Sequence, residues 1–80
     1  MTGTEFQDLV EYVSDNVNHV YDREAYELIG DRQPMPYELS DQIDEYAEEW
    51  CNENGIDPDE YYSEYSAEDV FFDDNYDFDA

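Results

Sequence analysis

The chain has 80 residues, of which 25 are Asp or Glu, two are Arg and none is Lys, so its formal net charge is -23. This length suits one domain near the lower limit for a single hydrophobic core, and Cys51 is alone, so no disulfide framework can support the fold. The charge excludes direct binding to nucleic acids or anionic membranes, because both are bound through clusters of Lys and Arg.

The hydrophobic content predicts a folded chain despite this charge. Hydrophobic residues make up 40% of the sequence and aromatic residues 18%, more than a solvated tail carries. No apolar run approaches the roughly 18 residues of a membrane span, and the first residues lack a leader pattern. We therefore expect a soluble cytoplasmic protein of all-α class, in which residues 1–80 form a single acidic domain. Its core would be a small bundle of three to four short helices, followed by an acidic aromatic C-terminal arm.

The first predicted helix spans residues 5–21. Thr4 and Gln7 have the spacing of a capping box. Apolar side chains then recur at helical spacing, at Phe6, Leu9, Val10, Val13, Val17, Val20 and Tyr21. His19 comes four residues after Asp15, which predicts a surface contact between them and not a catalytic or metal-binding role.

A short second helix is expected at residues 23–29, with Asp22 as its cap and Gly30 as its stop. A loop follows at residues 31–36. Arg23 and Arg32 lie in this part of the chain, and we expect them to form exposed ion pairs with nearby carboxylates, each worth only ~0 to 1 kcal/mol.

The third predicted helix, residues 36–53, carries the densest charge. One side has the apolar residues Leu39, Ile43, Tyr46, Ala47 and Trp50, and Asn54-Gly55 forms a stop signal. Five acids project from the other side or its flank, on successive turns about 5.4 Å apart, and we call them the acidic ridge: Asp41, Asp44, Glu45, Glu48 and Glu49. Like charges at these spacings destabilise a helix by a few tenths of a kcal/mol per pair. The repetition indicates that the charge serves a partner.

A fourth helix is predicted at residues 58–65, with Asp57 as N-cap, Pro58 in the first position and Glu60 completing a capping box. Residues 66–80 form the arm. It begins with a turn carrying Val70, Phe71 and Phe72 and ends in alternating acids and aromatics. Two interpretations stay open: an edge strand with Tyr76 and Phe78 on one side, or an arm anchored by Phe71 and Phe72.

Catalytic and metal sites are not expected. One His and one Cys far apart in the sequence give no catalytic constellation, so we predict no enzyme activity and no cofactor. Two stretches have partial calcium-loop spacing, but Phe78 and Tyr62 stand where each loop needs Gly. The residues concerned are Asp73, Asn75, Asp77 and Asp79 in one stretch and Asp57, Asp59 and Glu68 in the other.

In these features the chain resembles the small acidic DNA-mimic inhibitors of phages and mobile elements: Ocr, the ArdA family, acidic anti-CRISPR proteins and uracil-DNA glycosylase inhibitors. The resemblance lies in the near absence of basic residues, the acidic ridge and the Tyr-rich acidic runs. It implies a phage-encoded anti-restriction or anti-CRISPR inhibitor that occupies the nucleic-acid-binding site of a basic host protein. Phosphate-like charge would come from the acidic ridge, extended by Glu53, Asp59, Glu60 and Glu64, and partner contacts from Tyr12, Tyr62 and Tyr65.

Two other interpretations stay open. One is an acidic adaptor or antitoxin-like binder of a basic protein, whose tail with Phe71, Phe72, Tyr76 and Phe78 folds onto that partner. The other is a domain adapted to molar salt, in which the acids keep the surface hydrated. The oligomeric state cannot be inferred from the sequence.

Overall fold

The computed structural model describes residues 1–77, and in this range all regular structure is helical, which confirms the predicted all-α class. In chain order the elements are α1 (Gly3–Asn16), the 3-10 turn η1 (His19–Tyr21), α2 (Asp22–Gly30), α3 (Tyr37–Glu53), α4 (Pro58–Glu64) and α5 (Ala67–Phe71). The Cα radius of gyration is 11.9 Å and the long axis measures 35 Å.

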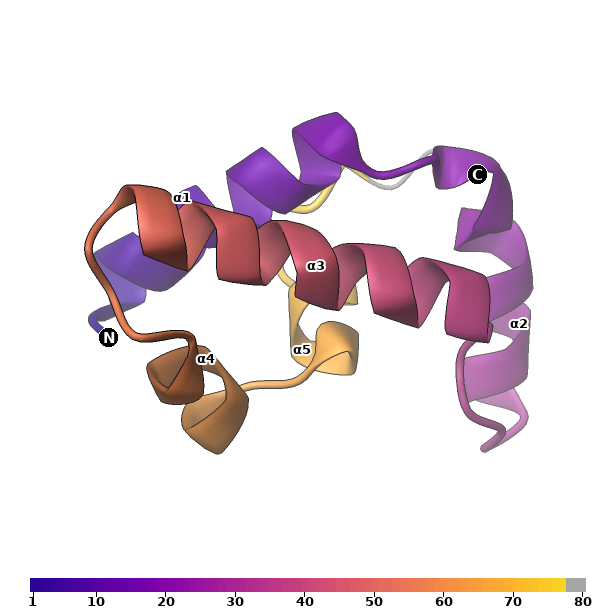
Figure 1. Ribbon diagram of the computed structural model, residues 1–80. Helices are drawn as coiled ribbons and strands as arrows, with labels where there is room; N and C mark the ends of the chain where they lie inside the picture. The colour runs from indigo at the N-terminus through magenta and orange to yellow at the C-terminus, as the bar shows by residue number, and fades with distance from the viewer. Residues whose placement is uncertain (78–80) are drawn as a thin grey trace.

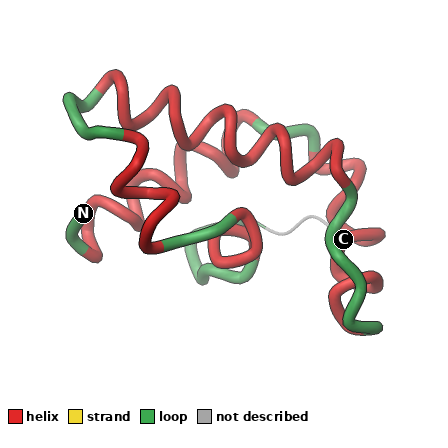
Figure 2. Tube along the Cα trace, turned by 60° about the horizontal axis from the view of Figure 1, so that its bottom comes forward, coloured by secondary structure: helices red, strands yellow, loops and turns green. Residues whose placement is uncertain are grey.

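The long helix α3 is the centre of the arrangement (Figure 1). It packs against α1 along one flank and against α4 and α5 along another. In Figure 1, α3 crosses the front of the molecule, α2 lies across its N-terminal end, and α4 and α5 lie beneath it. Figure 2 turns the molecule so that α4 and α5 come forward. Because α3 is covered on its apolar side only, its remaining side is left to solvent.

The core gathers apolar side chains from α1, α3, α4 and α5. Leu9, Val13, Leu39 and Ile43 have no exposed surface. Tyr61 of α4 is equally buried, and Phe71 and Tyr76 also belong to the core. Cys51 is fully buried and burial raises the pKa of its thiol, so this residue is a small apolar core group.

The first helix begins and ends earlier than predicted. Its capping box is formed by Thr2 and Glu5, and not by Thr4 and Gln7, because the helix begins at Gly3. It ends at Asn16 instead of continuing to residue 21. The backbone is extended at Val17, which ends the helix, and the Asn18 side chain then caps η1 by accepting a hydrogen bond from the Val20 amide at 3.1 Å. Val20, predicted to lie on the apolar side, is therefore 71% exposed.

The second helix agrees with its predicted span, but its ends are made differently. Asp22 does not cap it; the residue is the first of the helix and is fully buried. Gly30 is the last helical residue, and the chain turns at Arg32, whose φ is 61°. The Gln33 amide donates to the Leu28 carbonyl at 2.8 Å, which closes the turn as a Schellman motif.

The ends of α3 and the start of α4 follow the sequence signals. Gly55, with φ of 70°, allows the Ile56 amide to donate to the Cys51 carbonyl at 2.8 Å, the same closing bond. Asp57 caps α4 by accepting from the Asp59 amide at 3.0 Å, as predicted. The predicted capping box is absent, because the Glu60 carboxylate instead binds the amino group of Met1 at 3.0 Å.

Residues 66–77 pack onto the helices. A capping box of Ser66 and Asp69 starts α5. Phe71 and Tyr76 are buried while Phe72 is half exposed, so of the two residues expected to anchor the arm only Phe71 does so. The predicted edge strand is wrong within residues 66–77, where Tyr76 follows a turn; Phe78 lies outside the described residues.

Candidate partner-binding surface

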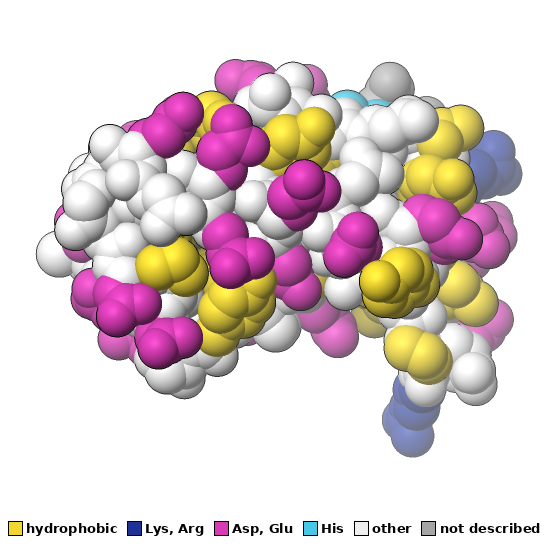
Figure 3. Space-filling model, viewed as in Figure 1, with side chains coloured by type: hydrophobic (Ala, Val, Ile, Leu, Met, Phe, Trp, Pro, Cys, Tyr) yellow, Lys and Arg dark blue, Asp and Glu magenta, His cyan; other side chains and the backbone are white. Residues whose placement is uncertain are grey.

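The carboxylates of α3 all project from one half of the helix. At 100° per residue, the acidic ridge together with Glu38 and Glu53 falls within about 180°, and the buried residues of α3 fall in the other half. Asp41, Glu45, Glu48 and Glu49 are exposed, and Asp44 is half-buried at the edge. Figure 3 shows Asp and Glu side chains following α3 across the visible face, whereas the Arg side chains seen there lie at the α2 end.

Tyrosine side chains hold the ridge from both flanks. On the α1 flank, the Tyr12 hydroxyl donates to Glu49 at 2.8 Å, and this hydrogen bond raises the pKa of Tyr12 to about 12. On the α4 flank, the Tyr61 hydroxyl donates to Asp44 at 3.2 Å. Each bond restricts a carboxylate that would otherwise sample several rotamers, so part of the anionic array is fixed before any partner arrives.

Asp44 lies in a less polar setting than the rest of the ridge. Burial raises the pKa of its carboxyl, the hydrogen bond from Tyr61 lowers it, and the nearby charges of Glu48 and Asp41 raise it further. The net shift is upward. Asp44 therefore loses its charge at a higher pH than an ordinary Asp carboxyl group does.

The predicted extension of the ridge along α4 divides into two kinds of residue. Glu53, Asp59 and Glu64 are exposed. Glu60 is paired with the Met1 amino group, and this hydrogen bond raises the pKa of the amine above 8.0. The pair neutralises one negative charge locally, so Glu60 contributes less to the anionic field than its neighbours do.

The three predicted contact tyrosines are placed differently. Tyr62 is 45% exposed and lies beside Tyr61 on α4. Tyr65 is half-buried and stacks on Phe6 with ring centroids 3.8 Å apart, and Tyr12 packs edge-on against Tyr46. The most exposed aromatic rings of the described residues are instead Tyr37 (76%) and Tyr26 (59%). Tyr37 is the first residue of α3 and lies outside the sector of the helix that is buried. Its exposure could therefore have been predicted from the helical spacing of the sequence.

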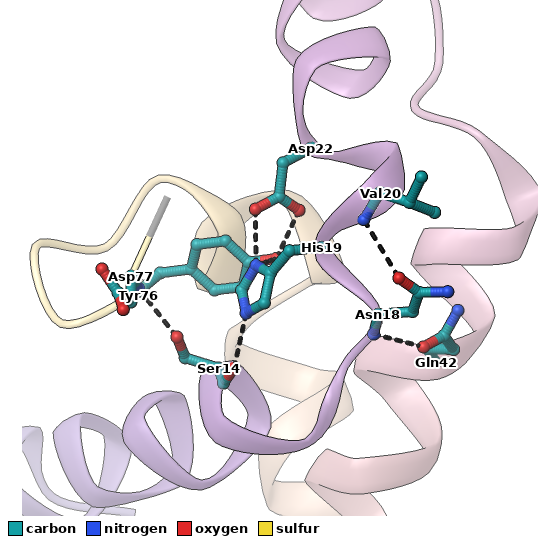
Figure 4. A network of polar contacts seen from close by, with 8 residues as sticks. All are labelled: Ser14, Asn18, His19, Val20, Asp22, Gln42, Tyr76 and Asp77. Atoms are coloured by element: carbon teal, nitrogen blue, oxygen red, sulfur yellow. Dashed lines mark hydrogen bonds and ion pairs between the residues drawn. The ribbon is translucent and has the colours of Figure 1, made fainter. Parts of the chain in front are cut away.

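A buried polar network joins the end of α1, the start of α2 and the last described residues (Figure 4). Asp22 accepts a hydrogen bond from the Tyr76 hydroxyl at 2.8 Å, and its other oxygen lies 2.6 Å from Nδ1 of His19. Nε2 of His19 lies 2.7 Å from the Ser14 carbonyl oxygen, and the Asp77 amide donates to the Ser14 hydroxyl at 2.8 Å. The predicted contact of His19 with Asp15 is therefore wrong, because the helix ends before His19.

Burial lowers the pKa of His19, but its hydrogen bonds with Asp22 and with the Ser14 carbonyl outweigh that effect, so the pKa lies above 6.5. Both neighbours are acceptors, which favours the doubly protonated ring. The network contains Ser, His and Asp, but Nε2 of His19 faces the Ser14 carbonyl oxygen, and the Ser14 hydroxyl accepts from the Asp77 amide. With Asp22 fully buried, these contacts join three segments of the chain.

Residues 1–77 contain no group of three or more His, Cys, Asp or Glu placed to hold a metal ion. The Asp73 carboxylate of one partial calcium loop accepts instead from the backbone and side chain of Asn75, both at 2.9 Å. None of the helices in this range is long and apolar enough to cross a membrane.

Comparison with known proteins gives no match: no protein-family model, no curated protein and no solved structure is similar to this chain.

Proposed function

We propose that the protein is a DNA-mimic inhibitor, encoded by a phage, that acts in the host cytoplasm by occupying the nucleic-acid-binding site of a defence or nucleic-acid-processing protein. The observation that carries this proposal is the charge spacing of α3. From Glu38 to Glu53 the helix rises about 22 Å at 1.5 Å per residue, and seven carboxylates lie along it. That is about one charge per 3 to 4 Å of helix axis, close to the roughly 3.4 Å of duplex axis per phosphate of one DNA strand.

The whole molecule supports the same comparison. Its net charge of -23 is spread over a long axis of 35 Å, or about one charge per 1.5 Å. Duplex DNA carries one charge per about 1.7 Å of axis. A protein that grips a duplex through a basic cleft would therefore meet a similar charge in a similar length, and association would be fast and sensitive to salt.

The fixed geometry of the ridge also favours this proposal. The ridge stands on a helix of 17 residues whose opposite side is buried, and Glu49 and Asp44 are hydrogen bonded by tyrosines from two other helices. A preorganised anionic array loses less conformational entropy on binding than a flexible acidic tail does.

The structure makes one alternative less favourable, namely an acidic adaptor whose C-terminal tail folds onto its partner. Two of its four aromatic residues, Phe71 and Tyr76, are already buried in the core, and Asp22 binds the Tyr76 hydroxyl. Their surface is not available to a partner without unfolding this part of the chain. An adaptor that uses the ridge instead would be separated from a mimic by competition, since only the mimic must exclude nucleic acid.

The identifying experiment is affinity capture from the lysate of a host cell, with and without nuclease, followed by mass spectrometry. We expect a basic nucleic-acid-binding protein that is retained after nuclease treatment and is displaced by added duplex DNA or RNA. Capture of a protein that binds its nucleic acid and this chain simultaneously would contradict the mimic and support the adaptor. Reversible unfolding below about 0.1 M salt, where the Debye length exceeds ~10 Å and the carboxylates repel one another over longer distances, would support the salt-adapted domain.

A further inference from the structure

Three neighbouring hollows lie around α5, and the first of them reaches the ridge residue Asp44. The first, of about 370 Å³, lies between α3, α4 and α5, and the second, of about 460 Å³, shares Tyr65 and Glu68 with it. The third, of about 300 Å³, shares Phe72 and Asp73 with the second. Adjacent hollows share lining residues, and we refer to the three hollows together as the α5 groove.

Aromatic rings and carboxylates both line the hollows of the α5 groove. The first hollow has Tyr62 and Tyr65 with Glu68 and Asp44, and the second has Tyr65 and Phe72 with Glu68 and Asp73. Phe72 is 50% exposed although Phe71 beside it is buried. No basic side chain lines any of the three hollows.

The carboxylates decide the charge of an occupant. An uncharged apolar segment seated here would remove water from several anionic groups without replacing those interactions, which is costly. A cationic side chain would offset the charge, and nucleic acid would be repelled. The occupant that complements the groove is therefore a basic protein segment.

The aromatic rings decide which basic side chain fits best. A guanidinium group is planar and weakly hydrated, so it can stack on an aromatic face while its N–H groups bind a carboxylate in a fork. The ammonium group of Lys is a strongly hydrated point charge that gains less from such a site.

We infer that the α5 groove binds an arginine-bearing segment of the partner protein. The inference rests on the proposed function, because that function requires a basic partner. It adds a second contact region, which prefers Arg to Lys on that partner. The ridge would supply phosphate-like charge without distinguishing Arg from Lys, whereas the groove would select Arg.

The test is an NMR titration of the full chain with two blocked peptides of equal length and charge, one containing Arg and the other Lys. We expect the Arg peptide to bind about three- to five-fold more tightly, the preference that one exposed cation–π contact gives, with shifts at Tyr65, Glu68 and Phe72. Phe72→Ala should abolish most of this preference. Tyr37→Ala, which removes an exposed ring outside the three hollows, should leave it intact.

Glu68→Gln gives an independent check, because Glu68 is exposed and the fold should tolerate the substitution. This variant should weaken both peptides, and Glu11→Gln on α1 should weaken them less. The inference would be overturned by equal affinity for the two peptides or by a Phe72→Ala protein that keeps the preference. It would also be overturned if the groove bound the arginines of a second copy of this chain. Those results would leave the DNA-mimic proposal unaffected. Conversely, a partner that does not compete with nucleic acid would contradict the mimic proposal but not the binding of Arg in the α5 groove.

Discussion

At the scale of single residues, His19 and Asp22 give the most specific expectations. The pKa of His19 is raised above 6.5, so its contribution to stability is complete below that pH and is lost as the pH rises through the folded-state value. The groups facing it are Asp22 at the start of α2, the Ser14 carbonyl at the end of α1, and Tyr76 and Asp77 near the C-terminus.

We therefore predict that the urea midpoint falls as the pH rises from about 6 to about 8, a range in which ordinary carboxyl groups stay ionised. The Met1 amine, whose pKa the Glu60 carboxylate raises above 8.0, adds a loss of the same sign only near the upper end of this window, because its unfolded-state pKa is about 8. Urea denaturation followed by circular dichroism measures the effect, and His19→Gln should flatten the dependence. A wild-type protein with the same midpoint across the range would show that the ring carries no stabilising charge.

Tyr76 gives a second prediction at this scale. Tyr76→Phe leaves the fully buried Asp22 without one of its donors, so the free energy of unfolding should fall by about 1 to 3 kcal/mol. Tyr61→Phe is the matched control, since Asp44 is only half-buried and the bond is longer, at 3.2 Å; its cost should be about 0.5 to 1.5 kcal/mol. Denaturant titrations of both variants give the comparison, and a larger loss for Tyr61→Phe would contradict the assignment of Asp22 as the buried centre.

At the scale of elements, the sequence predicts most helices because their signals are local. Asp57-Pro58 starts α4 and Asn54-Gly55 ends α3, and both depend only on capping and on backbone conformation. The apolar spacing of α3 likewise predicts its buried side.

Other features could not be predicted because they depend on tertiary contacts. Asp22 has the residue type of a cap, but its burial is decided by His19 and Tyr76, which come from other segments. Glu60 has the position of a capping-box residue, yet the Met1 amino group, 59 positions away, binds its carboxylate. Of the candidate site, the ridge itself was predictable from α3 alone, but the tyrosines that hold it belong to α1 and α4.

The two Schellman motifs yield a paired prediction. Arg32 occupies a left-handed conformation, φ of 61°, that costs a residue with a Cβ about 1 to 2 kcal/mol. Arg32→Gly should therefore raise the free energy of unfolding by about 0.5 to 1 kcal/mol. The gain is smaller than the strain relieved, because Gly loses more conformational entropy on folding than Arg does. Gly55→Ala, at φ of 70°, should lower it by about 1 kcal/mol or more, although open space surrounds the new methyl group. Thermal or urea unfolding measures both, and a destabilising Arg32→Gly would indicate that the Arg side chain has a contact that matters more than the backbone.

At the scale of the whole molecule, the proposal concerns where the charge lies. Every α-helix carries acids, but α3 holds seven in its exposed half and forms the longest continuous line of charge among the described residues. If only net charge mattered, any carboxylates would be equivalent to those of α3. If the chain imitates nucleic acid, those on α3 should matter more.

The decisive measurement compares two variants that each lose four exposed carboxylates. One variant loses them from α3, and the control loses them from α1 and α2. The α3 variant is Asp41→Asn, Glu45→Gln, Glu48→Gln and Glu53→Gln, and the control is Asp8→Asn, Glu11→Gln, Asp15→Asn and Glu24→Gln. For both variants we measure how strongly the variant inhibits the captured partner's binding to its nucleic acid. The salt concentration is about 0.1 M, at which exposed charges are only partly screened. We predict at least a ten-fold loss of inhibition for the α3 variant, about 0.3 to 0.5 kcal/mol per charge, and a much smaller loss for the control. Equal losses, or none in the α3 variant, would contradict the claim that the ordered carboxylates of α3 take the place of phosphates.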